Sequence, residues 1–343
     1  MKFRIARLFA AACLALLGAA AAQAQTKLLF STFFPPTHPI VRGVMQPWAD
    51  DVKAATKGEV VIEFSPTSLA PPPGQLDMVA NGVADVTLQF SGVVPNRLTA
   101  MLVTEMPGPV STSEAMSLAL WRTYGKYFAK ADEHKPLKVL SAVVFPPQGF
   151  FGVRDEPFTK IEQFRGAKIA TTPGTVGRIF GAVTPGVIAG PAVRYFELVS
   201  KGTVDAYASV TALDVIGFNL GRHTKTSTRL NDLMGAASFS LVMNQAKWAA
   251  LTPQQQEAIT ALSGEAFGRR MAVLDEADRK ATETLRSSGV KFVDAPPELR
   301  QELARAFAFA EKEWVEQVGK RGVDGKAAIA FYRGEHLRLA GSR

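Results

Sequence analysis

The sequence predicts an α/β protein of two similar lobes, each built on a mostly parallel sheet with helices on its faces. Short apolar runs alternate with segments of helical periodicity, and one such unit recurs later in the chain. The length of 343 residues suits two domains. With 47% hydrophobic and 20% charged residues, the chain has the composition of a globular protein, which excludes a disordered or fibrous one.

The first unit alternates strands and helices. Residues 28–31 form a short apolar run that predicts a strand, and apolar residues recur at helical spacing over 41–55. Residues 59–64 and 85–90 predict two further strands, with a second helical face at 76–80 between them. This order is typical of parallel strands joined by crossover helices.

A short pattern occurs twice and predicts an internal duplication. The stretch Asn81-Gly82-Val83-Ala84-Asp85 matches Lys201-Gly202-Thr203-Val204-Asp205. In both, a glycine ends a helix and an aspartate stands at the start of the next strand. The alternative is a chance match between two ordinary helix–stop–strand units.

The chain is expected to change lobes twice. The apolar run 139–145 is broken by Pro146-Pro147-Gln148-Gly149 and resumes at 150–153, and such a strand can cross from one lobe to the other. A second crossing is expected near Met234. The expected organisation is lobe I at 25–146 with roughly 235–275, lobe II at 147–234 with part of 276–320, long bridging helices near the C-terminus, and a C-terminal tail at 320–343.

The N-terminus predicts an export signal over residues 1–24. Three cations at Lys2, Arg4 and Arg7 precede an apolar run over 8–22, and Ala22-Gln23-Ala24 fits the small-x-small rule for cleavage before Gln25. The alternative is a short membrane anchor, but a run of about 15 residues is shorter than the ~20 that span a bilayer. We therefore expect an exported, soluble protein located in the periplasm.

Composition excludes several kinds of partner. The formal charge is +8, and removal of the three charges of the signal leaves about +5 without any dense Lys/Arg run, so nucleic acid is not expected. Cys13 is the only cysteine, which excludes a disulfide framework and a thiolate zinc site. The sequence has no Gly-x-Ser-x-Gly elbow, Walker A motif or His-Glu-x-x-His motif. No catalytic residue, metal or cofactor is expected.

A ligand is expected beyond the carboxyl ends of the strands, in a cleft between the two lobes. Helix N-termini point there, and their unpaired N–H groups suit anions. The loops at these ends are rich in Phe, Pro, Gln, Ser and Thr and carry few carboxylates. This composition favours a small organic ligand with an apolar part over a divalent metal.

The candidate ligand contacts are aromatic and polar side chains in these loops. Phenylalanines predict an apolar, aromatic-friendly pocket, with core packing as the alternative; amides and hydroxyls near strand ends predict hydrogen bonds to a ligand, with loop self-capping as the alternative. His38 is included because it lies in a cleft loop, whereas the other three histidines are expected in ordinary surface roles. The candidates are Phe33, His38, Gln75, Gln89, Gln148, Phe150, Thr172, Tyr207 and Ser209, with Phe34, Phe90 and Phe151 as further wall residues.

From Lys27 to about Trp314 the sequence resembles the periplasmic solute-binding subunits of tripartite ATP-independent periplasmic (TRAP) transporters of the DctP type. The suggestive stretches are residues 48–52, 81–85, 161–169, 201–205 and 251–255, taken in their order and spacing. The resemblance implies the two-lobed fold of a periplasmic binding protein, a ligand in the cleft, and delivery to a permease driven by an ion gradient.

One departure from the family pattern concerns charge. Similar members carry an arginine that clamps a substrate carboxylate where this sequence has Ala170, and a second one near Phe150 or Phe151. We expect Arg194 or Arg178 to supply the cation from a neighbouring loop, the alternative being a solvated arginine on a helix. A dicarboxylate held in the usual manner is not expected.

The expected function is therefore that of a monomeric solute receptor. It would bind a small organic acid, a monocarboxylate or an aromatic or apolar acid, and deliver it to the membrane permease subunits of a TRAP transporter. The alternatives are an exported binding protein that senses an uncharged solute and a periplasmic hydrolase.

Overall fold

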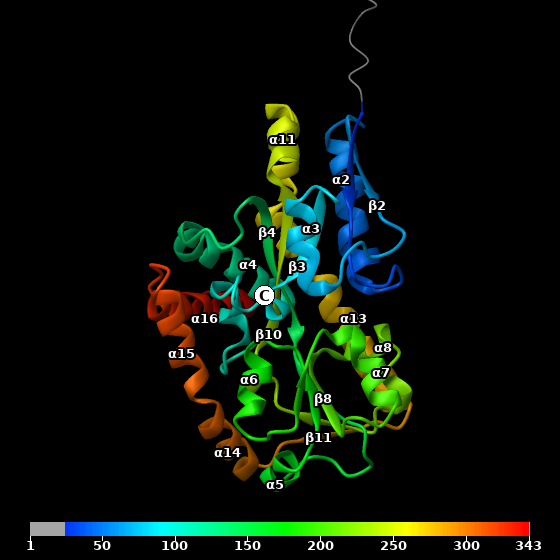
Figure 1. Cartoon of the computed structure of the whole chain (residues 1–343), viewed down its shortest axis with the longest axis vertical. Coiled ribbons are helices and arrows are strands. Elements are labelled where there is room, and N and C mark those ends of the chain that lie inside the picture. The colour runs from blue at the N-terminus through cyan, green and yellow to red at the C-terminus, as the bar shows by residue number, and fades with distance from the viewer. Residues whose placement is uncertain (1–24, 343) are drawn as a thin grey trace, which may run out of the picture.

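The computed structural model describes residues 25–342, and the expected export signal lies outside the described residues. Two lobes follow one another along the long axis, each with a sheet flanked by helices (Figure 1). The predicted two-lobed α/β fold is confirmed.

The sheet of lobe I has the strand order β2-β1-β3-β10-β4. The first three strands in this order are parallel, and β10 runs antiparallel to both of its neighbours. β3 and β10 are buried along their whole length, as central strands covered on both faces are. The strands are β1 (Thr26–Phe30), β2 (Val60–Phe64), β3 (Val86–Phe90), β4 (Leu137–Pro147) and β10 (Ala236–Asn244).

The sheet of lobe II has the order β11-β9-β5-β8-β6-β7. Here β5 is antiparallel to both of its neighbours, and the other pairs are parallel. Both sheets are thus mixed, because β10 in lobe I and β5 in lobe II run against the other strands. The strands are β5 (Gly149–Gly152), β6 (Ile169–Thr171), β7 (Val187–Ala189), β8 (Ala206–Val210), β9 (Thr226–Arg229) and β11 (Lys291–Asp294).

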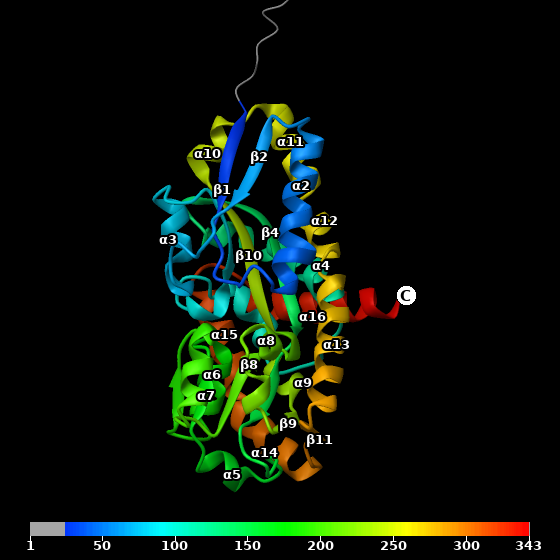
Figure 2. The same ribbon diagram turned by 90° about the vertical axis from the view of Figure 1, so that its right-hand side faces the viewer.

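The helices divide between the lobes as Figures 1 and 2 together show. Lobe I carries α2 (Gln46–Ala55), α3 (Gln75–Ala80), α4 (Ser113–Thr123), α10 (Gln245–Ala250), α11 (Pro253–Ala261) and α12 (Gly264–Arg269). Lobe II carries α5 (Ile161–Arg165), α6 (Thr175–Gly181), α7 (Tyr195–Ser200), α8 (Ala212–Gly217) and α9 (Asn231–Met234). The C-terminal part adds α13 (Ala272–Ser287), α14 (Pro297–Phe307), α15 (Phe309–Gly319) and α16 (Gly325–Gly341).

The matched stretches of the two halves make the same contacts. In lobe I the Leu29 N–H donates to the Asp85 carboxylate at 2.8 Å, and in lobe II the Lys168 N–H donates to that of Asp205 at 2.9 Å. Each aspartate N–H donates in return to the carbonyl of the same partner residue, at 2.8 Å in both lobes. The glycine before each strand, Gly82 or Gly202, has a positive φ that ends the preceding helix. The aspartate therefore joins the start of its own strand to the neighbouring parallel strand in both halves.

Helix α13 joins the lobes along one edge of the molecule (Figure 2). Its Asp275 accepts a hydrogen bond from the Ser113 N–H at the start of α4, at 2.8 Å. One turn further on, Asp278 accepts from the Leu213 N–H at the start of α8, at 2.9 Å. Two carboxylates on one helix thus cap the N-termini of one helix from each lobe.

The segment expected as a C-terminal tail forms α16, which packs on α4. Asp324 caps its N-terminus by accepting from the Ala327 N–H at 3.0 Å. Tyr332 and His336 are buried on its inner face, and His336 forms a hydrogen bond with Ser111 at 3.0 Å. The helix therefore contributes to the core of lobe I.

The chain passes between the sheets at two adjoining points. β4 is interrupted at Gln148 before β5 begins, and Gly235 separates α9 from β10. The Gln148 N–H donates to the Gly235 carbonyl at 3.0 Å, so the two crossings are joined by a backbone hydrogen bond. Gly235 has φ 63° and ψ −143°, a combination that only glycine adopts readily.

We expect Gly235→Ala to destabilise the protein by more than the strain of a positive φ alone. A Cβ at this position would lie 2.2 Å from the Thr104 carbonyl oxygen, so the backbone at the crossing would have to move. Gly202→Ala is the matched control, because Gly202 has φ +64° and no atom within 4 Å of its would-be Cβ. The control should lose about 1–2 kcal/mol in urea unfolding followed by circular dichroism. Equal losses in both variants would contradict the predicted clash.

Candidate ligand-binding site

A cavity lies between the lobes, beside the two crossings. It encloses about 460 Å³ of empty space, open solvent at its mouth included. Lobe I contributes residues from the ends of its strands, lobe II contributes the starts of two helices, and Gln148 lies at the crossing. The lining residues are Phe33, Phe34, Pro72, Phe90, Val93, Phe145, Gln148, Pro191, Ala192, Val193, Ser209, Val210, Thr211, Asp214, Phe218, Ala237 and Phe239.

Phe34 is the centre of the aromatic wall. It follows β1, and its ring contacts that of Phe33 at a centroid distance of 4.5 Å, Phe145 at 5.7 Å and Phe218 at 6.4 Å. Phe239 on β10 in turn stacks on Phe145 at 4.1 Å. Such pairs are worth about 0.5–1.5 kcal/mol each beyond their burial, so the wall is preorganised by its own contacts.

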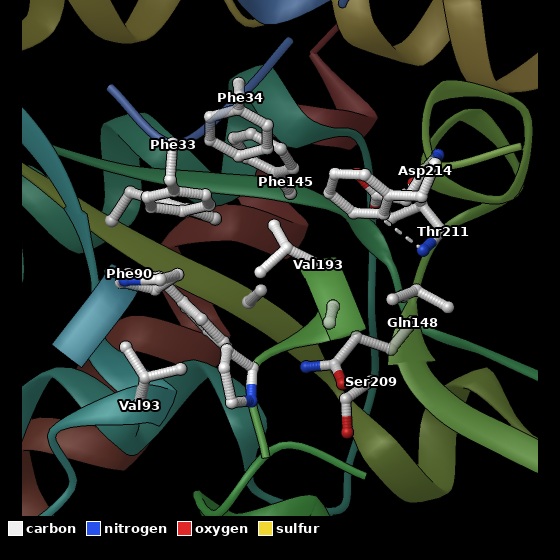
Figure 3. Close-up of a pocket in the computed structure, with 17 residues that line it drawn as sticks. Phe33, Phe34, Phe90, Val93, Phe145, Gln148, Val193, Ser209, Thr211 and Asp214 are labelled. Carbon is white, nitrogen blue, oxygen red and sulfur yellow. Dashed lines mark hydrogen bonds between the residues drawn. The ribbon is translucent and has the colours of Figure 1, made fainter. Parts of the chain in front are cut away.

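The polar side of the cavity is formed by an amide, two hydroxyls and a carboxylate. Figure 3 shows Gln148 and Ser209 on one side of the cavity, with Phe33 and Phe90 opposite. Gln148 is almost fully buried, and neither atom of its side-chain amide has a hydrogen-bond partner among the described residues. Buried polar groups without partners are rare in folded proteins, so this amide is a candidate to form hydrogen bonds with a ligand.

Ser209 owes its position to an irregularity in lobe II. In the antiparallel pair of β5 and β8, Gly149 faces Val210 whereas Phe150 faces Ala208, so Ser209 is the extra residue of a bulge. It has φ +67°, which is strained for a residue other than glycine. Ser209 lines the cavity, and its hydroxyl accepts a hydrogen bond from the Thr172 N–H at 3.2 Å.

Asp214 is a buried carboxylate held by its own lobe and by lobe I. Its Oδ2 accepts hydrogen bonds from the Thr211 N–H at 2.9 Å and the Thr211 hydroxyl at 2.8 Å, the capping box of α8 (Figure 3). Its Oδ1 lies 3.2 Å from Nε2 of His38. Because the Ile40 N–H donates to Nδ1 of His38 at 3.3 Å, Nε2 carries the proton and donates to Asp214. His38 thus supports the cavity lining from behind, through this hydrogen bond and through ring contacts with Phe34 at 4.7 Å and Phe218 at 6.0 Å.

Of the residues predicted from the sequence, Phe33, Phe34, Phe90, Gln148 and Ser209 line the cavity, and Phe151 does not. Thr172 and His38 lie directly behind it, bonded to Ser209 and Asp214. Their contact with a ligand stays a prediction. These lining residues, together with Thr172 and His38, lie at the carboxyl ends of strands or in the following loops, as expected for an α/β lobe.

Four predicted residues are held by other contacts outside the cavity lining. Gln75 accepts from the Thr87 hydroxyl at 2.7 Å, and Gln89 donates to the Phe90 carbonyl at 2.6 Å. The hydroxyls of Tyr207 and Thr224 are 2.5 Å apart. Phe150 packs in the core of lobe II, for example against Phe164 at 4.9 Å.

The two arginines proposed as replacement clamps are also outside the lining. Arg178 forms an ion pair with Glu313 on α15, and its guanidinium lies over the ring of Phe309. Arg194 is exposed to solvent one residue after Val193, which does line the cavity. None of the described residues that line the cavity is a lysine or arginine. Ala170 stands where similar members of the family carry the clamping arginine, and it is fully buried.

Sequence reasoning missed several lining residues. Phe145 and Phe239 come from the strands next to the crossings, and Phe218 follows α8. Thr211 and Asp214 could have been found, because Thr-x-x-Asp after an apolar strand is a capping signature that places both side chains at a helix start beside the cleft.

The sequence profile of the bacterial extracellular solute-binding protein, family 7 (DctP), matches residues 30–317. The chain belongs to this family. A TRAP periplasmic solute-binding protein from Bordetella bronchiseptica with bound (R)- and (S)-mandelate has a TM-score of 0.87 at 28% identity, over 92% of this chain and 99% of that one. A TRAP solute-binding protein from Rhodoferax ferrireducens in complex with copurified benzoate shares the fold, with a TM-score of 0.83 at 24% identity over 92% and 98%.

A third relative carries a different name. The outer membrane transporter protein TsaT of Comamonas testosteroni is 32% identical over 335 residues, which cover 98% of this chain and 98% of that protein. Within residues 25–342, no helix is both long enough and apolar enough to pass through a membrane. Receptors of TRAP transporters work with membrane permeases, and the family assignment gives this chain the same kind of partner.

The lobes of this family 7 receptor also meet at a buried carboxyl group. Glu105 ends a 3-10 segment (Ala100–Glu105) that is tied to β10 by a hydrogen bond from the Thr104 hydroxyl to the Ala236 carbonyl at 2.7 Å. The Glu105 side chain accepts from the Thr175 N–H at the start of α6, in lobe II, at 2.9 Å. Burial raises the pKa of Glu105 from an ordinary 4.5 to about 7, against the hydrogen bonds from Thr175 and Val176 that lower it.

We expect this carboxyl group to make the protein less stable as the pH rises from about 4.5 to about 7. The folded state holds the proton in this window and the unfolded state does not, so stability is greatest below it and is lost above it. Glu105→Gln is neutral throughout and should raise the Tm at pH 8 while changing it little at pH 5. Exposed Glu257→Gln is the control, and scanning calorimetry is the measurement. A lower Tm for Glu105→Gln at pH 8 would show that the carboxylate's hydrogen bonds outweigh its burial.

Proposed function

We propose that this receptor binds a small aromatic carboxylic acid in the interlobe cavity and delivers it to the permease of a TRAP transporter. The observation that carries the proposal is the wall of six phenylalanine rings facing an unpartnered glutamine amide. A wall of this kind accepts a flat apolar ring, and the amide fixes the orientation of a polar group. The mandelate-binding relative from Bordetella bronchiseptica supports this ligand class.

Binding couples to closure because the two lobes supply different parts of the site. Phe34, Phe145 and Phe239 belong to lobe I, whereas Phe218 and Ser209 belong to lobe II. A ligand that contacts both sets favours the closed form over the open one by the contacts that only closure makes. We expect the chain on either side of the two crossings to absorb the movement, with the Gln148–Gly235 hydrogen bond kept.

The ligand is released unchanged under this proposal. Both ring nitrogens of His38 are engaged, one with the Ile40 N–H and one with Asp214, so His38 has no free nitrogen to act as a base. Ser209 accepts a hydrogen bond from Thr172 and is not paired with a histidine. Removal of an export signal at residues 1–24 and a monomeric state in the periplasm complete the proposal.

The ligand panel follows from the shape and charge of the cavity. Benzoate and mandelate should bind to residues 25–343 in calorimetry and raise the Tm. Succinate should not, because none of the described lining residues is a cation that would offset a second carboxylate. Glucose should not bind, because its hydroxyls would face phenyl rings.

Phe218→Leu should weaken benzoate binding about fivefold, and Phe158→Leu, in the core of lobe II, should lower only stability. Binding of succinate or glucose in preference to the aromatic acids would end the proposal.

A second candidate ligand is an uncharged aromatic solute, which Asp214 favours. Its carboxylate lines the cavity and no lysine or arginine among the described lining residues offsets it, so it opposes a bound anion. The Asp214 carboxylate nevertheless accepts hydrogen bonds from Thr211 and His38, and these bonds reduce its repulsion of a bound anion.

We expect Asp214→Asn to bind benzoate about fivefold tighter than the unaltered protein, since one repulsion of roughly 1 kcal/mol is removed. The affinity for benzamide, a neutral molecule of the same shape, should stay within twofold. Calorimetry with both compounds is the measurement. Stronger binding of benzamide than benzoate by the unaltered protein would favour the uncharged ligand.

A further inference from the structure

The side chain of Gln148 is presented to the cavity by a fixed backbone. Its N–H donates to the Gly235 carbonyl at 3.0 Å, and its carbonyl accepts from the Asn231 side-chain amide at 2.8 Å. The next residue, Gly149, is already paired with Val210 in the sheet of lobe II. The amide therefore starts from a position set by both crossings.

The amide needs a donor and an acceptor at once. Its Nε2 and Oε1 are both buried and both lack a hydrogen-bond partner among the described residues. Exchanging the two atoms leaves the same need, so the argument holds for either orientation of the amide. Leaving such groups unpaired in a closed cavity is unfavourable for each atom.

A plain carboxylate meets only half of this need. Its oxygens accept from Nε2, but they offer no proton to Oε1 and would repel it. The neighbouring carboxylate of Asp214 offers no proton either, because it accepts from Thr211 and His38. A ligand in the cavity can supply the missing donor.

The geometry of the amide restricts where that donor can be. Nε2 and Oε1 are attached to one carbon atom, so the ligand's acceptor and donor must also be close neighbours. A hydroxyl on the carbon that bears the carboxylate satisfies this condition, and a hydroxyl on the far side of an aromatic ring does not. We propose that Gln148 selects aromatic 2-hydroxy acids over the same acids without the hydroxyl, its Nε2 donating to the carboxylate and its Oε1 accepting from the hydroxyl.

This inference rests on the proposed function and names the ligand class within it. The test compares mandelate with phenylacetate, which differs only in lacking the 2-hydroxyl, by calorimetry on residues 25–343. Mandelate should bind about tenfold tighter, the effect of one buried hydrogen bond together with the unpaired oxygen that its loss leaves. Equal affinities would overturn the inference and leave the aromatic-acid receptor standing, whereas no binding of either acid would overturn both.

Variants assign the discrimination to the side chain. Gln148→Met has a similar length and no amide, so its preference for mandelate over phenylacetate should fall to about twofold or less. Gln255→Met is the matched control, because Gln255 is also buried but lies at the start of α11, and it should keep the tenfold preference. A preference that survives in Gln148→Met would exclude the assigned role. The preference of the unaltered protein decides the ligand class even if a variant does not fold.

The pH dependence of ligand affinity distinguishes binding of a 2-hydroxy carboxylate from binding of a neutral, protonated carboxylic acid. A neutral carboxyl group also offers a donor and an acceptor on one carbon, and its affinity would rise about tenfold for each unit that the pH falls. We expect the mandelate affinity to agree within twofold between pH 6 and pH 8. A tenfold or larger rise at pH 6 would overturn the selection of a hydroxyl in favour of binding the protonated acid.

Discussion

The hydrogen bond between the Gln148 N–H and the Gly235 carbonyl is the constraint on which the cavity depends. Two strands must pass between the lobes side by side, and their backbone groups have to be paired where the sheets end. Gly235 can stand there because its backbone adopts a conformation closed to other residues. The same pairing leaves the Gln148 side chain facing the cleft. One backbone contact thus joins the lobes and orients the most distinctive polar group of the site.

The layout of the fold could be predicted because it rests on local signals. Alternating apolar runs and helical periodicity gave two α/β lobes, and the matched Asp85 and Asp205 stretches make equivalent contacts in the structure. The proline-rich break after Phe145 marked the region of the first crossing, since it interrupts an apolar strand. The antiparallel course of β5 and β10 was not visible, because strand direction depends on how distant segments come together.

The site was predicted less completely, and the phenylalanines show why. Phe150 was expected at the cavity, but it packs in the core of lobe II, whereas Phe145 lines the cavity. Side chains alternate between the faces of a strand, and the break at Gln148 shifts that alternation by an amount the sequence does not reveal. Arg178 illustrates a second limit of sequence reasoning: its partner Glu313 is far away in the chain, and only the folded arrangement of α6 and α15 brings the pair together.

A cleft without an arginine clamp binds and releases a ligand in a different way from one that has it. A clamp on a single lobe holds an anion whether the lobes are open or closed, because its charge stays beside the ligand. Here the rings of Phe34 and Phe239 come from one lobe and that of Phe218 from the other, so opening separates the apolar contacts and returns water to them. Affinity then depends mainly on closure, and a permease that opens the lobes would also weaken the binding of the ligand. In the proposed function, the aromatic wall therefore couples capture on closure to release on opening, without an arginine's charge that must be overcome.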